Sequence, residues 1–162
     1  MTRPLTRVIF CALIPLLSPA LFVAASGKPD FSGTWVLNLE KSRLDPRMHV
    51  EMGTITIDHR EPQFHFHRLF VTAGKNDEFS YALTTDGKET VAEEKGQTVH
   101  SHLYWDGDVL VYSVLMVRQD GRQATNIVRY SLRDGGKTIV AEEKFRGPIL
   151  KYDNLWISDR KS

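Results

Sequence analysis

Four of the six histidines form two His-x-His pairs, His65 with His67 and His100 with His102. Side chains two residues apart share one face of a β-strand, so each pair could offer two imidazoles to zinc, copper or haem iron. The opposite faces of these segments carry better core residues, namely Phe64, Phe66, Val99, Leu103 and Trp105. We therefore expect the histidines to face water and no cofactor to be bound, with a metal or haem site as a further alternative.

Arg129 is a candidate for holding an anionic ligand, provided that its side chain points into the protein. In a strand it shares a face with Ile127 and Ser131, whereas Val128 and Tyr130 lie on the opposite, more apolar face. The apolar face should point inward, so we expect Arg129 to lie outside.

The sequence contains no recognisable catalytic motif. Two similar segments end in the acidic pairs Glu93-Glu94 and Glu142-Glu143, with no other carboxylate or histidine close by in the sequence. We interpret both pairs as solvent-facing. No Gly-x-Ser-x-Gly turn and no glycine-rich phosphate loop occurs. This argues against the common hydrolase and nucleotide-binding classes, although catalytic residues that converge only in space would leave no such motif.

The elements that must position these side chains are β-strands. Segments rich in Val, Ile, Thr and aromatic residues predict strands at 31–38, 54–59, 63–71, 78–84, 90–94, 98–105, 109–118, 125–133, 138–145 and 150–158. Asp-Gly pairs, which favour tight hairpin turns, occur at 86–87, 106–107, 120–121 and 134–135. The pattern predicts an all-β fold, an up-and-down antiparallel meander barrel of about eight to ten strands, with a two-sheet β-sandwich as the alternative.

Residues 1–25 have the features of a secretory signal peptide. Arg3 and Arg7 precede an apolar stretch, and small residues follow near 23–25. Phe10 before Cys11 argues against a lipid anchor, and Cys11 is the only cysteine. We therefore expect an exported protein, periplasmic or secreted, with one barrel domain at 26–162. Its net charge of +1 would become −1 on cleavage, and we expect neither nucleic acid nor an integral membrane location.

The mature domain opens with Phe-Ser-Gly-Thr-Trp at 31–35. Further segments that fit one barrel pattern are 85–88, 104–111 and 129–132. These features resemble the lipocalin and fatty-acid-binding (calycin) superfamily and, within it, small exported lipocalin-like proteins of bacteria. The resemblance implies a barrel whose end is plugged by the Gly-x-Trp indole, and a small apolar or amphipathic ligand in the interior.

Two departures from the resemblance bear on that ligand. The last strand reads Asn154-Leu155-Trp156, whereas the fatty-acid-binding proteins carry an Arg-x-Tyr anchor for the ligand carboxylate. The segment 40–52 is also too short for their helix pair, and Pro46 interrupts it. Fatty-acid binding is therefore not implied.

The aromatic side chains Trp35, Tyr112, Tyr130 and Trp156 are the candidates for contact with a ligand in the interior or at the mouth of the barrel. A second feature points to a different function. The strand at 109–117 is apolar on both faces, whereas a strand with one face in water should alternate apolar and polar residues. Its outer face is a candidate surface for a protein partner or a second copy of the chain, which would make the protein an interaction module with a solid barrel.

Overall fold

The structure is a computed structural model that describes residues 27–161. All ten predicted strands are present in this range, with ends displaced by a few residues at most. They are β1 (Gly33–Leu37), β2 (Val50–Arg60), β3 (Gln63–Thr72), β4 (Lys75–Thr84), β5 (Thr90–Glu94), β6 (Gln97–Asp106), β7 (Val109–Arg118), β8 (Gln123–Arg133), β9 (Thr138–Arg146) and β10 (Lys151–Arg160). The expected signal peptide lies outside the described residues.

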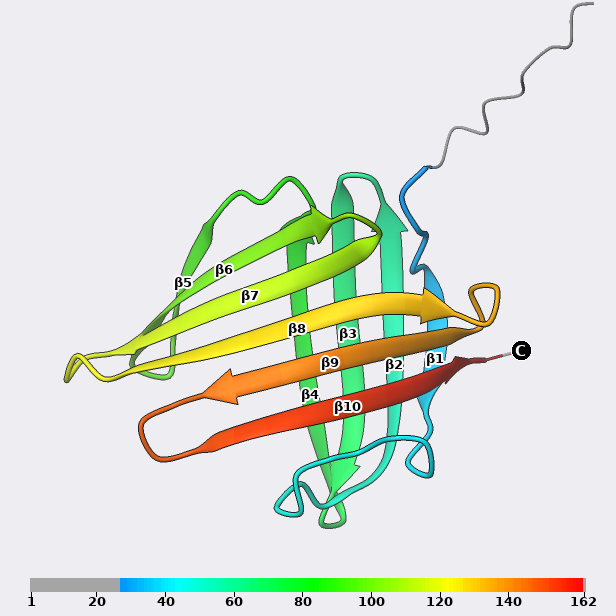
Figure 1. The fold of residues 1–162 in the computed structure, drawn as a ribbon. Coiled ribbons are helices and arrows are strands. Elements are labelled where there is room, and N and C mark those ends of the chain that lie inside the picture. The colour runs from blue at the N-terminus through cyan, green and yellow to red at the C-terminus, as the bar shows by residue number, and fades with distance from the viewer. Residues whose placement is uncertain (1–26, 162) are drawn as a thin grey trace, which may run out of the picture.

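The ten strands belong to one antiparallel sheet in the order β4-β3-β2-β1-β10-β9-β8-β7-β6-β5. Strand β1 joins the two halves because it pairs with both β2 and β10. In Figure 1, strands β1 to β4 form one layer and β6 to β10 cross in front of it. A single sheet bent round in this way confirms the up-and-down barrel and not the sandwich. Since β4 and β5 stand at the two ends of the order, the barrel is nearly closed rather than closed.

Three of the four Asp-Gly pairs form the predicted hairpins. Residues 106–107, 120–121 and 134–135 connect β6 with β7, β7 with β8 and β8 with β9. The prediction is wrong for Asp86-Gly87, which lies between β4 and β5, the two strands at opposite ends of the sheet order. The reason is that Asp-Gly favours a positive φ, here +78° at Gly87, but does not determine which strands pair beside it.

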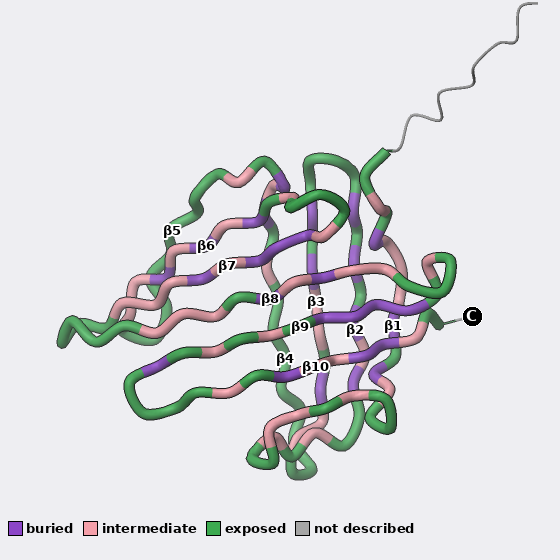
Figure 2. Tube along the Cα trace, viewed as in Figure 1, coloured by how far each residue is buried: buried purple, intermediate pink, exposed green. Residues whose placement is uncertain are grey.

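The hydrophobic core fills one end of the barrel. Its fully buried large side chains include Phe31, Trp35, Phe64, Leu103, Leu110 and Ile139. Burying a side chain of this size stabilises the fold by roughly 1.5–3 kcal/mol. Figure 2 shows the buried stretches concentrated where the two layers cross, whereas β5 is exposed along its length.

The connection between β1 and β2 contains no helix, as its length and Pro46 predicted. It is fastened to the last strand instead, because Arg43 and Leu155 exchange backbone hydrogen bonds of 2.8 Å. Nowhere in residues 27–161 is there a helix that is long and apolar enough to cross a membrane.

A polar cluster around Glu61 lies beside the core. The Glu61 carboxylate accepts hydrogen bonds from the Thr85 hydroxyl at 2.6 Å and from the Trp105 indole at 2.8 Å, and it lies 2.9 Å from Nε2 of the buried His59. Partial burial raises the pKa of Glu61, but these hydrogen bonds outweigh it and hold the pKa below its ordinary value. The cluster therefore connects β2, β6 and the segment after β4.

Candidate ligand cavity

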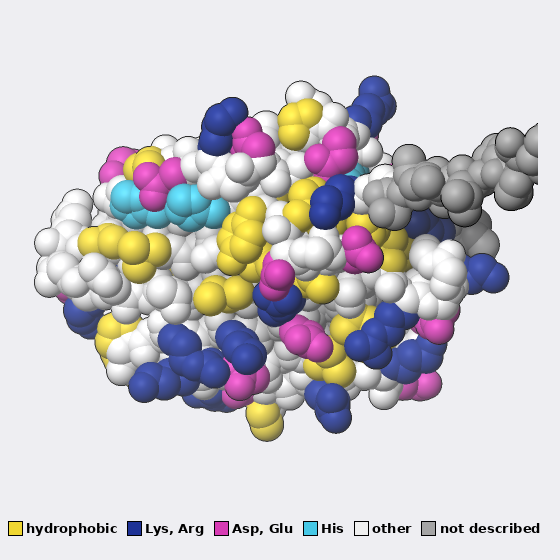
Figure 3. Space-filling model, turned by 45° about the horizontal axis from the view of Figure 1, so that its top comes forward, with side chains coloured by type: hydrophobic (Ala, Val, Ile, Leu, Met, Phe, Trp, Pro, Cys, Tyr) yellow, Lys and Arg dark blue, Asp and Glu magenta, His cyan; other side chains and the backbone are white. Residues whose placement is uncertain are grey.

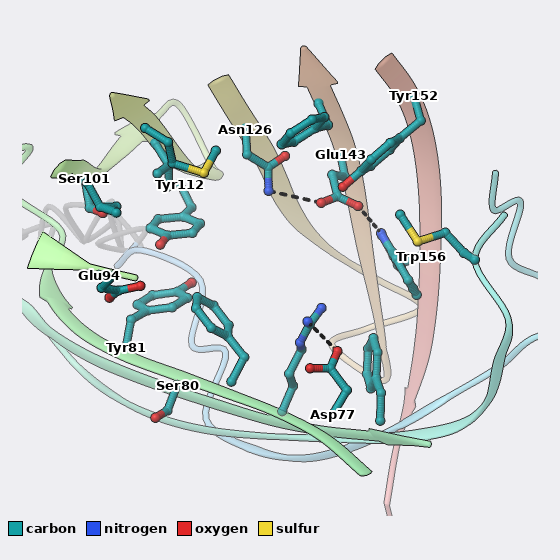
Figure 4. Close-up of a pocket in the computed structure, with 18 of the residues that line it drawn as sticks. Asp77, Ser80, Tyr81, Glu94, Ser101, Tyr112, Asn126, Glu143, Tyr152 and Trp156 are labelled. Atoms are coloured by element: carbon teal, nitrogen blue, oxygen red, sulfur yellow. Dashed lines mark hydrogen bonds and ion pairs between the residues drawn. The ribbon is translucent and has the colours of Figure 1, made fainter. Parts of the chain in front are cut away.

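A cavity of about 510 Å³ lies inside the barrel beside the core, and core residues such as Phe70, Tyr112 and Val114 line it. This volume falls within the range of about 300–1,000 Å³ typical of small-molecule sites. The lining comes from strands β2 to β10 and from residues 47–49 just before β2, and it includes edge-strand residues such as Ser80 and Ala92. Figure 4 shows the lining side chains converging on one space. The interior of this barrel is therefore not solid.

Stacked aromatic rings form one wall of the cavity. The rings of Tyr81 and Tyr112 stack with centroids 4.3 Å apart, and Tyr81 also stacks on Phe66 at 4.9 Å. Tyr81 lies on the edge strand β4 and Tyr112 on β7, so the stack connects the two layers by side chains near the open edges of the sheet. Offset stacks of this kind contribute about 0.5–1.5 kcal/mol beyond the area that they bury.

Glu143 places a carboxylate in the cavity. Its Oε1 accepts a hydrogen bond from Asn126 Nδ2 at 3.0 Å, and its Oε2 accepts from Asn154 Nδ2 at 2.9 Å and from Trp156 Nε1 at 2.8 Å. The expectation that both residues of the pair Glu142-Glu143 face solvent is therefore wrong for Glu143, although Glu142 is exposed. Glu143 turns inward because it shares its face of β9 with Ala141, and the three donors offset the cost of removing the carboxylate from water.

An arginine–aspartate pair lies across the cavity from this carboxylate (Figure 4). Arg68 Nη2 donates to Asp77 Oδ2 at 2.9 Å, and the guanidinium lies over the rings of Phe70 and Phe79 at 4.8 and 5.4 Å. Arg47, which lines the same cavity, is paired with Asp45 at 2.6 Å. Both arginines of the lining are thus already engaged by a carboxylate.

Three buried polar atoms in the cavity wall have no hydrogen-bond partner among the described residues. They are Arg68 Nε, the Tyr81 hydroxyl and Asn126 Oδ1. An unpaired buried polar group costs about 1–3 kcal/mol, so native proteins rarely keep several of them in one place. Their concentration around one space indicates that a molecule entering the cavity can complete their hydrogen bonding.

The tyrosines of the cavity stay protonated far into the alkaline range. Burial raises the pKa of Tyr112, Tyr81 and Tyr130. The neighbouring Tyr130 and Tyr112 add to the rise at Tyr81, whereas the neighbouring Tyr81 opposes the rise at Tyr130. Burial, followed by the nearby Glu143 carboxylate, raises the pKa of Tyr152 to about 12. These side chains act as neutral hydrogen-bonding groups and not as bases.

The four aromatic candidates for ligand contact lie in two places. Tyr112 and Trp156 line the cavity, and Tyr130 lines an adjoining pocket of about 80 Å³ that shares much of the same wall. Trp35 lies in the core instead, with its indole N–H donating to the Phe31 carbonyl at 3.0 Å. Arg129 lies outside, as predicted, and pairs with Asp106 at 2.8 Å.

The two histidine pairs face outward, as the alternation predicted, and Figure 3 shows histidine side chains beside acidic ones on the surface. His67 lies 2.7 Å from a Glu78 oxygen, and His100 and His102 lie 3.1 and 3.4 Å from Glu89. In the part of the chain that the structure describes, no group of three or more His, Cys, Asp or Glu side chains could hold a metal ion. Three of the four histidines, His67, His100 and His102, pair with surface carboxylates.

The outer face of β7 is partly covered by the chain itself. Val111 is 1% exposed, whereas Val109, Leu115 and Val117 on the same face are only half-buried. Figure 3 shows hydrophobic side chains in small groups separated by charged ones. Association through residues 109–117 stays a prediction.

Arg68, Asn126 and Glu143 are among the cavity residues that the sequence analysis missed. A signal was present for each, because alternation places Arg68 with Phe66 and Phe70, Asn126 with Val128, and Glu143 with Ala141. A polar residue in the inward series of a strand is a candidate for the interior.

No protein-family model matches the chain, and comparison with curated proteins finds no relative. Solved structures do match. A secretory abundant heat soluble protein from Ramazzottius varieornatus has a TM-score of 0.52 at 13% identity, with 85% of this chain and 98% of that one covered. The zebrafish ileal bile acid-binding protein complexed with cholic acid has a TM-score of 0.52 at 12% identity, with 81% and 98% covered. Apo lipid binding protein 8 of Caenorhabditis elegans has a TM-score of 0.50 at 8% identity, with 81% and 95% covered.

These likenesses show that the chain shares its fold, a nearly closed up-and-down antiparallel β-barrel, with these proteins. At such low identity they show the fold alone.

Proposed function

We propose that the chain binds one small apolar or amphipathic molecule inside its barrel. The observation that carries the proposal is the cavity of about 510 Å³, with its aromatic wall and its three buried polar atoms without partners. Sites of this kind are mainly apolar, with a few polar groups that fix the orientation of the ligand. Two structural neighbours, a bile acid-binding protein and a lipid binding protein, support the proposal through the shared fold.

The test is the binding of N-phenyl-1-naphthylamine, a neutral apolar probe whose fluorescence increases in a dry environment. Val114 lines the cavity, and the change Val114→Phe would fill part of it; the neighbouring Leu115 faces outward, so Leu115→Phe is the matched control. We expect saturable binding to the wild type and to Leu115→Phe, and at least about tenfold weaker binding to Val114→Phe. Circular dichroism confirms that each variant is folded. Equal binding by both variants, or none by the wild type, would contradict the proposal.

We further propose that the chain acts outside the cytoplasm. The support is the sequence of residues 1–25 and the absence of cysteine from residues 26–162, which leaves the proposed mature chain no thiol to oxidise in an oxidising compartment. Expression of the full chain with a C-terminal tag, followed by cell fractionation and mass spectrometry, tests the proposal. The expected product is recovered outside the cytoplasm and begins close to residue 26. Uncleaved protein confined to the cytoplasm would overturn it.

A further inference from the structure

The carboxylate of Glu143 is held inside the barrel by neutral groups alone. Its three hydrogen bonds come from the amides of Asn126 and Asn154 and from the indole of Trp156. In the described part of the chain it forms no ion pair, whereas the arginines of the same cavity, Arg68 and Arg47, are each paired with an aspartate. The charges of those pairs cancel, so the negative charge of Glu143 remains for whatever occupies the cavity.

A second acceptor lies beside this carboxylate. An ionised carboxylate can only accept hydrogen bonds, so the amide of Asn126 must turn its Nδ2 toward Glu143 and its Oδ1 away from it. That Oδ1 is one of the buried atoms without a partner. Two oxygens on neighbouring strands therefore line the cavity and can accept a further hydrogen bond: the charged Oε1 of Glu143, which has one donor, and the neutral Oδ1 of Asn126, which has none among the described residues.

The walls around these oxygens are aromatic. The indole of Trp156 donates its hydrogen bond to Glu143. In the same lining, the rings of Phe145 and Tyr152 stack with centroids 5.0 Å apart. Aromatic faces attract cations, and they also pack well against an alkyl chain. An anionic head group would instead meet the negative charge of Glu143, and the two guanidinium groups of the lining, those of Arg68 and Arg47, each already pair with an aspartate.

We propose that the cavity selects amphipathic amines, that is, molecules with an apolar body and a protonated primary amino group. The ammonium would donate hydrogen bonds to Glu143 and to Asn126 Oδ1, and the apolar part would lie against the aromatic wall. This inference rests on the proposed function and specifies the chemistry of its ligand. It also gives a role to Asn154 and Trp156 of the last strand, because both donate hydrogen bonds that orient the Glu143 carboxylate.

The test compares three ligands that share an alkyl chain and differ in the head group. Dodecylamine, dodecanol and dodecanoate compete with N-phenyl-1-naphthylamine at neutral pH and low salt, below their aggregation concentrations. We expect dodecylamine to bind about tenfold more tightly than dodecanol, because the hydrogen bond to Glu143 is charge-assisted, and dodecanoate to bind most weakly. This comparison uses the wild type and does not depend on how a variant folds.

The matched variants are Glu143→Gln and Glu142→Gln. They neutralise adjacent residues of β9, of which Glu143 faces the cavity and Glu142 is exposed. We expect Glu143→Gln to bring the affinity for dodecylamine down to that for dodecanol, and Glu142→Gln to retain the preference. Equal binding of all three ligands, tightest binding of dodecanoate, or an undiminished preference in folded Glu143→Gln would overturn the inference and leave the proposed function standing. If neither the probe nor any of the three ligands binds, the proposed function itself fails.

Discussion

The guanidinium of Arg160 lies 4.1 Å from the centre of the Trp35 ring, so a side chain of the last strand covers the indole of the first. The same guanidinium donates to the carbonyl of Ser32 at 2.6 Å and to that of Gly136 at 3.0 Å. Gly33 permits this approach, because a Cβ at that position would stand 2.5 Å from Arg160 Nη1. One arginine thus ties β1, β10 and the β8–β9 turn together.

Replacing Arg160 by alanine should therefore destabilise the barrel. We expect the free energy of unfolding in urea to fall by about 1–3 kcal/mol, from the lost charge-assisted hydrogen bonds and the cation–π contact. Arg60→Ala is the control, since the Arg60 side chain is 83% exposed and pairs only with Asp58, and it should change stability by no more than about 0.5 kcal/mol. Equal losses for the two variants would show that Arg160 has no special role.

Gly53 determines the position of a cavity side chain. A Cβ on Gly53 would stand 2.5 Å from Phe70 Cδ1 and 3.3 Å from Leu37 Cβ, so Gly53→Ala must displace the Phe70 ring, which lines the cavity. We expect a loss of about 1–3 kcal/mol in unfolding free energy together with altered binding of N-phenyl-1-naphthylamine. Gly27→Ala, where no atom of residues 27–161 lies within 4 Å of the new Cβ, should change neither quantity. A Gly53→Ala variant with the unfolding free energy and the probe binding of the wild type would refute the close contact between Gly53 and Phe70.

Two substitutions of Tyr81 separate the contribution of its ring to stability from that of its hydroxyl. Its ring stacks on Phe66 and Tyr112, whereas its hydroxyl is buried without a partner. Tyr81→Phe should therefore leave the unfolding free energy unchanged or slightly higher, because an unpaired buried polar group is removed. Tyr81→Ala should cost about 3–5 kcal/mol through the cavity that it leaves. A loss above about 1 kcal/mol in Tyr81→Phe would mean that the hydroxyl does have a partner.

The stability of the fold should decrease in acid because aspartates in three surface turns become protonated. Hydrogen bonds from Arg47, Lys88 and Arg122 lower the pKa values of Asp45, Asp86 and Asp120, respectively, from 3.8 to about 2. A carboxylate whose pKa is lower in the folded state stabilises the fold above its unfolded value, and this stabilisation is lost as the pH falls from about 4 to about 2.

The measurement is the urea midpoint as a function of pH. We expect the midpoint to fall over that interval, and the fall to be smaller in Asp120→Asn, which removes one of the three titrating groups. A midpoint that stays level, or a variant whose profile has the slope of the wild type, would rule out this contribution from Asp120.

Local patterns in the sequence were sufficient to predict the strands, most of their turns and the outward side chains. Alternation along a strand follows from backbone geometry alone, which is why the orientations of Arg129 and of the histidine pairs could be derived. That β4 and β5 do not pair could not be derived, because Asp86-Gly87 favours a turn conformation whether or not its flanking strands pair. The interruption of the barrel at these strands is a property of the whole sheet.

The interior chemistry was decided by the tertiary structure. Alternation could have turned Glu143 inward, but nothing near it in sequence shows that an inward carboxylate would be tolerated. Its donors, Asn126, Asn154 and Trp156, come from the strands on either side, and only the pairing of β8 and β10 with β9 brings them to one carboxylate. The sequence by itself thus determined a barrel of alternating strands, because alternation is local. Only the tertiary structure determined that the barrel is hollow and holds a carboxylate, because both depend on residues that are distant in the chain.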